Sequence, residues 1–376
     1  MIYLDHAATT PLRPEAAAAM EPFSGERFGN TSGSHEVSRR AKNALEEARE
    51  RAAVVLGALP SEVIFTGGGT EADNLAIKGA AQSSGGGAGI GGVVTVATEH
   101  EAVLETARFL ERMGSKVEVV GVDGHGLVDL EGLEKAVGPD TRVVSVMTIN
   151  NETGTRQPIR DVVEIARRSK YGVLVHTDAV QAFSSLSLDV SDLGVDLVSL
   201  AAQKFGGPQG VGLLYCRSGV KLEPLLYGGG QEYGRRSGTH NVAGIAGMAA
   251  AMEAAAADRP RFRAGVAEAR QAFEAKLSDR AARTVPETVS APQHSHLRLD
   301  VDNETMLIRL DRLGVAASAG SACQSGATTV SHVLSAMGLT VDQARHSLRF
   351  SFGWTSTLAE AERAAEFVIQ ALEGPI

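Results

Sequence analysis

Between about residues 60 and 216, short runs of β-branched and apolar residues alternate with stretches whose apolar residues recur at helical spacing. The short runs predict strands at Glu62–Phe65, Val93–Val96, Val117–Val120, Val143–Met147, Val173–Val175, Leu197–Leu200 and Val211–Leu214. The helical spacing predicts helices over Ala41–Leu56, Thr70–Ala81 and Pro158–Ser169. This alternation indicates an α/β fold whose seven-stranded, mostly parallel sheet lies between helices.

The pattern changes toward the C-terminal part of the chain. Ala249–Ala257 is an alanine-rich helical stretch, and Arg259-Pro260 interrupts it, because proline in a helix interior removes a hydrogen bond and clashes with the preceding turn. Strands near His296–Leu299 and Ala316–Ser318, followed by helices, predict a smaller α+β unit. We therefore expect a large domain over residues 12–258 and a small domain formed by residues 1–11 and 259–376.

Composition and charge narrow the classes of partner. The chain has 376 residues, 43% of them hydrophobic, which suffices for a full core. Its net charge is -9, and it has no block of Lys and Arg, which argues against direct binding of nucleic acid or an anionic membrane. We find no secretory signal and no apolar run of about 18 residues, so we expect a cytoplasmic protein without membrane attachment.

The chain has two cysteines, Cys216 and Cys323, which are too few for a disulfide framework and lack the spacing of a metal site. An inert buried thiol is the usual state of a lone cysteine, and Cys216, at the end of an apolar strand, fits it. Cys323 lies among the small residues of Ser318–Gly326. We expect an accessible loop there, which is where a nucleophilic thiol is useful.

Three further segments carry candidate chemistry. Gly67–Asn74 follows a strand and opens a helix, so it is either a tight connection or a phosphate cradle built from backbone N–H groups. Asp178 follows the strand at Val173–Val175, where it either caps a helix or pairs with a protonated ring nitrogen of pyridoxal phosphate (PLP). Lys204 follows another strand in an apolar, Gly-rich setting, which suits an exposed loop lysine or a Schiff-base lysine.

These residues belong to a larger set of motifs, and together the motifs closely resemble the NifS/IscS-type cysteine desulfurases. Those enzymes are fold-type I PLP enzymes of the class-V aminotransferase family, and the resemblance runs over nearly the full chain. The motifs are Tyr3–Pro11, Gly29-Asn30, Gly68–Glu71, Thr98–His100, Asn150–Gly154, His176–Asp178 with Gln181, Gln203-Lys204, Gly228–Glu232, Arg236–Thr239, Gly320–Cys323 and Leu348–Ser351.

The resemblance implies PLP as cofactor and L-cysteine as substrate. Lys204 would form the internal aldimine and later move the α-proton, and Cys323 would take the sulfur as a persulfide while L-alanine is released. The implied catalytic residues are Lys204, Cys323 and His100. The implied cofactor-binding residues are Gly69, Thr70, His100, Asn151, Asp178, Gln181, Gln203, Lys204 and Thr239, and those for the substrate are Asn30, Asn151 and Arg349.

The resemblance also assigns contacts to these residues. Asp178 would bond the pyridinium nitrogen, Gln181 and Asn151 would approach the ring hydroxyl, and His100 would stack on the ring. Thr70 would bind the phosphate of its own subunit and Thr239 that of the partner subunit, so the resemblance implies a homodimer. Arg349 and Asn30 would hold the substrate carboxylate, for which a planar guanidinium is chemically suited.

The small and polar residues that continue from Cys323 to about Ser331 resemble the subtype with a long cysteine loop, which delivers sulfur to an acceptor protein such as an iron–sulfur scaffold. The sequence does not choose between iron–sulfur cluster assembly and a thiolation pathway. Three positions depart from the family pattern, because Ala201 replaces a frequent Ser, Gln203 a frequent His and His6 a frequent Asn. We expect weaker retention of PLP from the first two.

Other functions are compatible with parts of this pattern. A selenocysteine lyase has the same fold and accepts a closely related substrate. An aminotransferase also shares the fold, but it has no need of the cysteine in Gly320–Cys323. A non-catalytic scaffold that has lost cofactor binding is the alternative from a different class, and Ala201 and Gln203 are the residues that suggest it.

Overall fold

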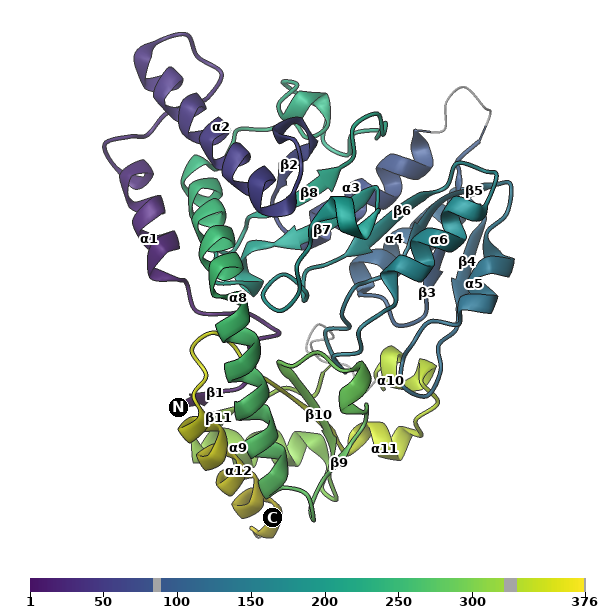
Figure 1. Ribbon diagram of the computed structural model, residues 1–376, viewed down its shortest axis with the longest axis vertical. Helices are drawn as coiled ribbons and strands as arrows, with labels where there is room; N and C mark the ends of the chain where they lie inside the picture. Colours follow the sequence, from purple (N-terminus) through teal and green to yellow (C-terminus); the bar gives the residue numbers. More distant parts are fainter. Residues whose placement is uncertain (84–88, 321–329, 375–376) are drawn as a thin grey trace.

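The computed structural model describes residues 1–83, 89–320 and 330–374 of the chain. Its centre is a seven-stranded sheet in the order β2-β8-β7-β6-β5-β3-β4 (Figure 1). β8 is antiparallel to both of its neighbours and the other paired strands run parallel. The strands are β2 (Val63–Thr66), β3 (Gly92–Val96), β4 (Val117–Val120), β5 (Thr141–Ser145), β6 (Leu174–Asp178), β7 (Leu197–Ala201) and β8 (Gly212–Cys216). The predicted α/β class and mostly parallel sheet are confirmed.

Helices cover both faces of this sheet because its strands are apolar on both faces. Val63 and Phe65 belong to an apolar cluster with residues of α2, α6 and α8, whereas Ile64, between them, packs in a second cluster with α3 and α4. Alternate residues of a strand point to opposite faces, so each cluster lies on one side of the sheet. The helices of this part are α1 (Pro14–Met20), α2 (Glu36–Leu56), α3 (Gly69–Gln82), α4 (Glu101–Arg112), α5 (Leu130–Ala136), α6 (Ile159–Arg168) and α7 (Val190–Leu193).

A smaller unit contains a three-stranded antiparallel sheet with β10 in its centre and a two-stranded parallel sheet of β1 and β11. Its apolar cluster joins Ile2 and Leu4 to residues from Phe262 onward. The strands are β1 (Ile2–Tyr3), β9 (Ala282–Arg283), β10 (His294–Arg298), β11 (Val315–Ala316) and β12 (Ser347–Ser351), and the helices are α9 (Asn303–Leu313), α10 (His332–Ala336), α11 (Val341–Arg345) and α12 (Leu358–Glu373). The domain boundaries at residues 11/12 and 258/259 stay a prediction.

The expected helix break at Arg259-Pro260 is wrong. α8 is one helix, Val242–Lys276, and Pro260 lies inside it. Ala255, before the proline, is buried in the core of the large sheet, and Phe262, after it, is buried in the cluster of the smaller unit. Packing on both sides therefore outweighs the cost of proline in the helix. In Figure 1, α8 runs from beside the large sheet down into the smaller unit.

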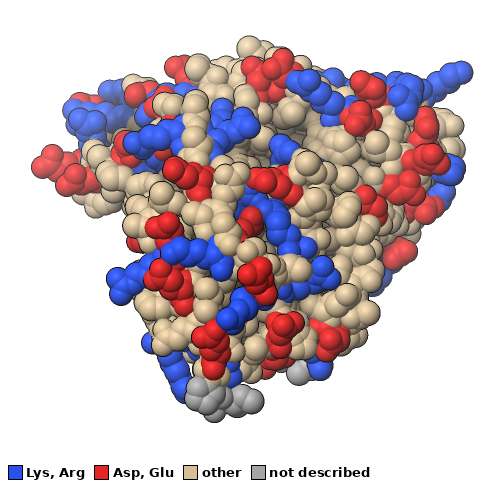
Figure 2. All heavy atoms as spheres, turned by 60° about the horizontal axis from the view of Figure 1, so that its bottom comes forward, with Lys and Arg blue, Asp and Glu red and all other residues tan. Residues whose placement is uncertain are grey.

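On the face shown in Figure 2, basic and acidic side chains are interspersed. Within the described ranges, none of the helices is both long and apolar enough to span a membrane. Cys216 is buried at the end of β8, as predicted, and burial raises the pKa of its thiol to about 11. A thiol with this pKa is protonated and unreactive at neutral pH.

Candidate active site

The first turn of α3 lies against the carboxyl ends of two neighbouring strands. A Cβ atom at Gly69 would lie 2.9 Å from Cγ2 of Val180 and 3.4 Å from the Cβ of Ala201. Val180 comes two residues after β6 ends at Asp178, and Ala201 is the last residue of β7. The structure therefore brings the backbone N–H groups at Gly69 and Thr70 to the edge of the sheet that carries Asp178 and Lys204.

Asp178 is buried at the end of β6 and accepts a hydrogen bond from the backbone N–H of Val180 at 2.9 Å. Burial raises the pKa of its carboxyl, and the charges of His100 and Lys204 act in the opposite direction. Two further buried acids lie near it, and burial raises the pKa of both Asp73 and Glu99 well above the ordinary values. Asp178 is thus a buried carboxylate whose ionised form gains from a cationic partner.

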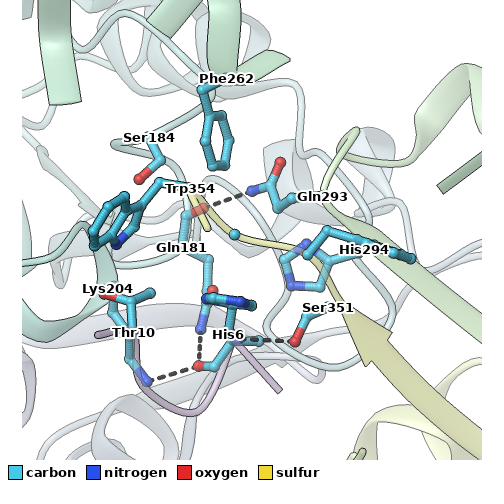
Figure 3. Close-up of a pocket in the computed structure, with 13 residues that line it drawn as sticks. His6, Thr10, Gln181, Ser184, Lys204, Phe262, Gln293, His294, Ser351 and Trp354 are labelled. Carbon is cyan, nitrogen blue, oxygen red and sulfur yellow. Dashed lines mark hydrogen bonds between the residues drawn. The ribbon is translucent and has the colours of Figure 1, made fainter. Parts of the chain in front are cut away.

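Lys204 ends a short 3-10 turn, Ala202–Lys204, directly after β7. Its Nζ atom donates hydrogen bonds to the carbonyl oxygens of Ala7 at 2.7 Å and Ala8 at 2.6 Å. The amide of Gln181 donates to the same Ala7 oxygen at 2.8 Å, and Figure 3 shows both side chains directed at it. The amine of Lys204 therefore lies where the N-terminal segment crosses the sheet edge.

A cavity adjoins Lys204 and is lined by residues from both parts of the molecule (Figure 3). Several polar side chains that line it have nitrogen or oxygen atoms without a hydrogen-bond partner. These atoms are Nδ1 of His6, Oε1 of Gln293, and Nδ1 and Nε2 of His294. The cavity beside Lys204 is therefore lined by both polar groups and the aromatic rings of Phe262 and Trp354.

Arg349 is supplied by β12 and is only 2% exposed. One terminal nitrogen donates to Oδ1 of Asp5 at 2.6 Å, and the other donates to the backbone oxygen of Asn151 at 2.8 Å. Its Nε atom is buried and has no hydrogen-bond partner. The guanidinium is thus held in one plane with N–H donors left over, which is the arrangement that binds a carboxylate through two bonds.

The other predicted site residues differ in where they lie. His100 caps α4, and its charge opposes the rise that burial causes in the pKa of Asp178. Asn30 and Thr239 are exposed, and the Asn30 side chain accepts a hydrogen bond from the backbone of Ser32 at 2.9 Å. Gln203 has a buried Oε1 atom without a hydrogen-bond partner. Cys323 lies outside the described residues.

Three buried acids lie within or beside the sequence motifs, and the pattern of the sequence does not mark them as site residues. Asp73 lies near the end of the segment Gly67–Asn74, Glu99 precedes His100, and Glu152 follows Asn151. Oε2 of Glu152 accepts a hydrogen bond from the hydroxyl of Ser331 at 2.8 Å, and burial raises the pKa of Glu152 to about 7. A charged residue within an otherwise small or apolar motif was the available signal, but only the fold shows that these carboxyls are buried.

The sequence matches the aminotransferase class-V family over residues 2–364. The chain belongs to this family.

Among the curated relatives of this family member, a protein named cysteine desulfurase IscS from Dictyoglomus turgidum is 43% identical over 95% of the chain and 90% of the relative. A solved structure titled NifS-like protein superposes with a TM-score of 0.93 at 36% identity and covers 99% of both chains. Another, titled SspA in complex with cysteine, has a TM-score of 0.83 at 35% identity and covers 94% of this chain and 99% of that chain.

Enzymes of this family depend on PLP, and this family member is a PLP-dependent enzyme. The residues at the sheet edge fit that cofactor. Lys204 offers a primary amine for the aldehyde, Asp178 a buried carboxylate for the ring nitrogen, and the first turn of α3 offers backbone N–H groups for the phosphate. Gly69 suits this cradle because a side chain there would collide with Val180.

Proposed function

We propose that the chain is a cysteine desulfurase that removes sulfur from L-cysteine, releases L-alanine and holds the sulfur as a persulfide on Cys323. The observation that supports it best is the convergence of Lys204, Asp178 and the first turn of α3 at one sheet edge, with Arg349 contributed from β12. The names of the relatives agree with this reaction. The alternative of a selenocysteine lyase differs only in the preferred substrate.

Bound PLP supplies an electron sink for the bonds at the α-carbon of an amino acid. In our proposal Lys204 holds the cofactor covalently and later moves the proton at the α-carbon, and Asp178 keeps the ring nitrogen protonated. Further contacts to the cofactor come from Gly69, Thr70, His100, Asn151, Gln181, Gln203 and the partner subunit's Thr239.

The substrate carboxylate is bound by Arg349 together with Asn30 and Asn151. Asp5 and the backbone oxygen of Asn151 each occupy one N–H of Arg349 and so fix the plane in which its remaining donors point. A fixed guanidinium orients the substrate as well as binding it. This arrangement selects an α-amino acid, and the choice of cysteine then depends on the group that receives its sulfur.

Cys323 is the proposed receiver. Its thiolate attacks the substrate sulfur, so that a new S–S bond forms while the bond between the substrate sulfur and its Cβ breaks. The electron pair of the broken bond stays with the carbon fragment, which gains a proton and leaves as L-alanine. One thiol of the enzyme and one cysteine thus give one persulfide and one alanine.

We further propose that the active unit is a homodimer, that a protein such as an iron–sulfur scaffold accepts the sulfur, and that the enzyme works in the cytoplasm. The exposed Thr239 supports the dimer, because its side chain is available to a second subunit. Mixed dimers of Thr239→Val and Lys204→Ala chains test it. If Thr239 crosses the interface, both lesions fall on one site and the other site keeps normal PLP binding. If every site of the mixed dimer is impaired, the shared site is wrong.

The reaction itself is tested with purified protein, PLP, L-cysteine and a thiol reductant. We expect sulfide and L-alanine in equal amounts, and their loss in Lys204→Ala, whereas Lys170→Ala, an exposed lysine, serves as the control. Consumption of cysteine without matching alanine would contradict the proposed reaction. Comparing the rates on cysteine and selenocysteine then separates the desulfurase from the lyase.

A further inference from the structure

A buried ion pair joins α2 to the segment that carries Thr239. The terminal nitrogens of Arg49 donate to the carboxylate of Glu232 at 2.7 and 2.8 Å, and the two residues are 2% and 4% exposed. Arg49 also donates to the backbone oxygen of Val63 at the start of β2. A paired guanidinium and carboxylate without access to water form a rigid, geometrically specific contact.

The carboxylate of Glu232 binds more than Arg49. It accepts hydrogen bonds from the backbone N–H of Phe65 at 2.8 Å and from Nε2 of His240 at 2.7 Å. Burial alone raises the pKa of Glu232, but the hydrogen bonds from Arg49 and His240 outweigh that effect and hold the pKa at about 2. The carboxylate is therefore ionised and fully occupied by partners.

The backbone at Glu232 is strained, which indicates that surrounding contacts fix the position of its side chain. Glu232 and Tyr233 have φ values of 50° and 58°, in the left-handed region that residues other than glycine rarely adopt. In the part of the chain that the structure describes, these are the two non-glycine residues with positive φ. Such strain persists only where surrounding contacts enforce it, and it is common at functional sites.

His240 leads from this ion pair toward two proposed site residues. Nδ1 of His240 lies 2.9 Å from the hydroxyl oxygen of Thr31, and these two residues directly follow Thr239 and Asn30 in the sequence. His240 thus links the carboxylate of Glu232 to the loop of Asn30, one of the proposed ligands of the substrate carboxylate.

A second ion pair links the same segment to the cradle of its own subunit. Nε of Arg236 donates to Oε1 of Glu71 at 2.8 Å, and Glu71 follows Thr70 in the first turn of α3. The segment from Gln231 to His240 is therefore attached both to the first turn of α3 and to the loop that contains Asn30. It includes Thr239, the residue proposed to reach the partner's cofactor.

We propose that Glu232 is a positioning residue that, pinned by Arg49, sets the places of both Asn30 and Thr239 through His240. The inference rests on the proposed function, since it takes the roles of Asn30 and Thr239 from it. One buried carboxylate then governs substrate binding in its own subunit and cofactor binding in the partner. Neither role requires Glu232 to touch a substrate or cofactor.

Thr31 provides the mildest test, because Thr31→Val removes the hydroxyl at nearly constant volume whereas Thr31→Ser keeps it. We expect Thr31→Val to raise KM for L-cysteine about threefold to tenfold, the effect of one lost hydrogen bond, with kcat changed less than about twofold. Thr31→Ser should restore the KM. Equal KM values in the two variants would overturn the proposed link to Asn30.

Glu232→Gln tests the ion pair itself, and Glu253→Gln is its matched control. Glu253 forms a comparable pair with Arg51 between α2 and α8, with Nε to Oε1 at 3.0 Å, but this pair is partly exposed. We expect Glu232→Gln to raise both KM and the dissociation constant of PLP about tenfold or more, and Glu253→Gln to change each by less than about twofold. Equal effects of the two substitutions would overturn the inference.

PLP affinity is measured by titrating apo-protein and following cofactor absorbance, so this readout does not need turnover. If the wild type does not act on cysteine, the proposed function fails, while the PLP titrations still compare Glu232→Gln with its control. If the wild type is active and the variants match their controls, the inference fails alone. Should Glu232→Gln not fold, the Thr31 variants decide the outcome.

Discussion

Arg349→Lys keeps the positive charge at the proposed carboxylate site and changes its geometry. In the structure, Asp5 and the backbone oxygen of Asn151 each take one donor of the guanidinium, and further donors remain on the same plane. A lysine ammonium has three donors on one atom. If two of them satisfy Asp5 and Asn151, one is left, so the two-bond contact with a substrate carboxylate cannot form.

The expected magnitude follows from the lost bond. A hydrogen bond to a charged group contributes about 1.5–3 kcal/mol, which corresponds to a rise in KM for L-cysteine of roughly tenfold to a hundredfold. We expect kcat to change much less, because the lost contact is made equally before and during the reaction. Initial rates of sulfide release over a range of cysteine concentrations measure both constants.

Arg309→Lys is a suitable control because Arg309 lies in α9 of the smaller unit and donates to the backbone oxygen of Ala371 at 2.6 Å, away from the site residues. Its KM should equal that of the wild type. Thermal unfolding and PLP absorbance of both variants show whether the fold and cofactor are retained. A KM within about twofold of the wild type in an intact Arg349→Lys enzyme would show that Arg349 holds Asp5 and not the substrate.

Four further substitutions have defined outcomes. Cys323→Ala should abolish sulfide release and leave the PLP spectrum unchanged, whereas Cys216→Ala should leave the rate nearly unchanged; the opposite pattern would reverse the two assignments. Burial raises the pKa of Glu152 to about 7 in the folded protein, so the stability that this group contributes falls as pH rises from about 4.5 to 7, and Glu152→Gln should remove a fall of up to about 3 kcal/mol in denaturant unfolding. A stability difference that does not vary with pH would contradict the assigned pKa. Gln203→His should tighten PLP by about 1–2 kcal/mol, more below the histidine pKa than above it, and equal or weaker binding at every pH would show that the site is built around Gln203.

The fold was largely predictable because the spacing of apolar residues along the chain indicates which positions are buried. That spacing differs between strands and helices. The predicted strand at Val117–Val120 has the bounds that β4 has in the structure, and the other strands shift by only a few residues. The strand order was not predictable, because neighbouring strands such as β2 and β8 are distant in sequence. The helix continues through Pro260 against the prediction, because the local cost of proline is visible in the sequence and the packing of Phe262 is not.

The site was predictable to the extent that its chemistry is local. Lys204 and Asp178 come at the carboxyl ends of two predicted strands. Because parallel strands present their carboxyl ends at the same edge of a sheet, the sequence alone predicts that the two residues lie near each other. The buried pair of Arg49 and Glu232 was not predictable, because the two residues lie 183 positions apart and each resembles a surface charge in the sequence. In the sequence, Glu232 is only the last residue of the glycine-rich motif Gly228–Glu232.

The pairing of β1 with β11 places Ile2 opposite Val315, and this has a consequence for biosynthesis. The first residues leave the ribosome long before the strand that will receive them, so the sheet of β1 and β11 cannot close until most of the chain has been translated. The carbonyl oxygens of Ala7 and Ala8 accept hydrogen bonds from Lys204, and these two residues lie a few positions after β1. Until β1 pairs with β11, their segment is not held in place by that sheet. Assembly of the lysine environment is therefore a late event on the nascent chain, after all seven strands of the large sheet have emerged.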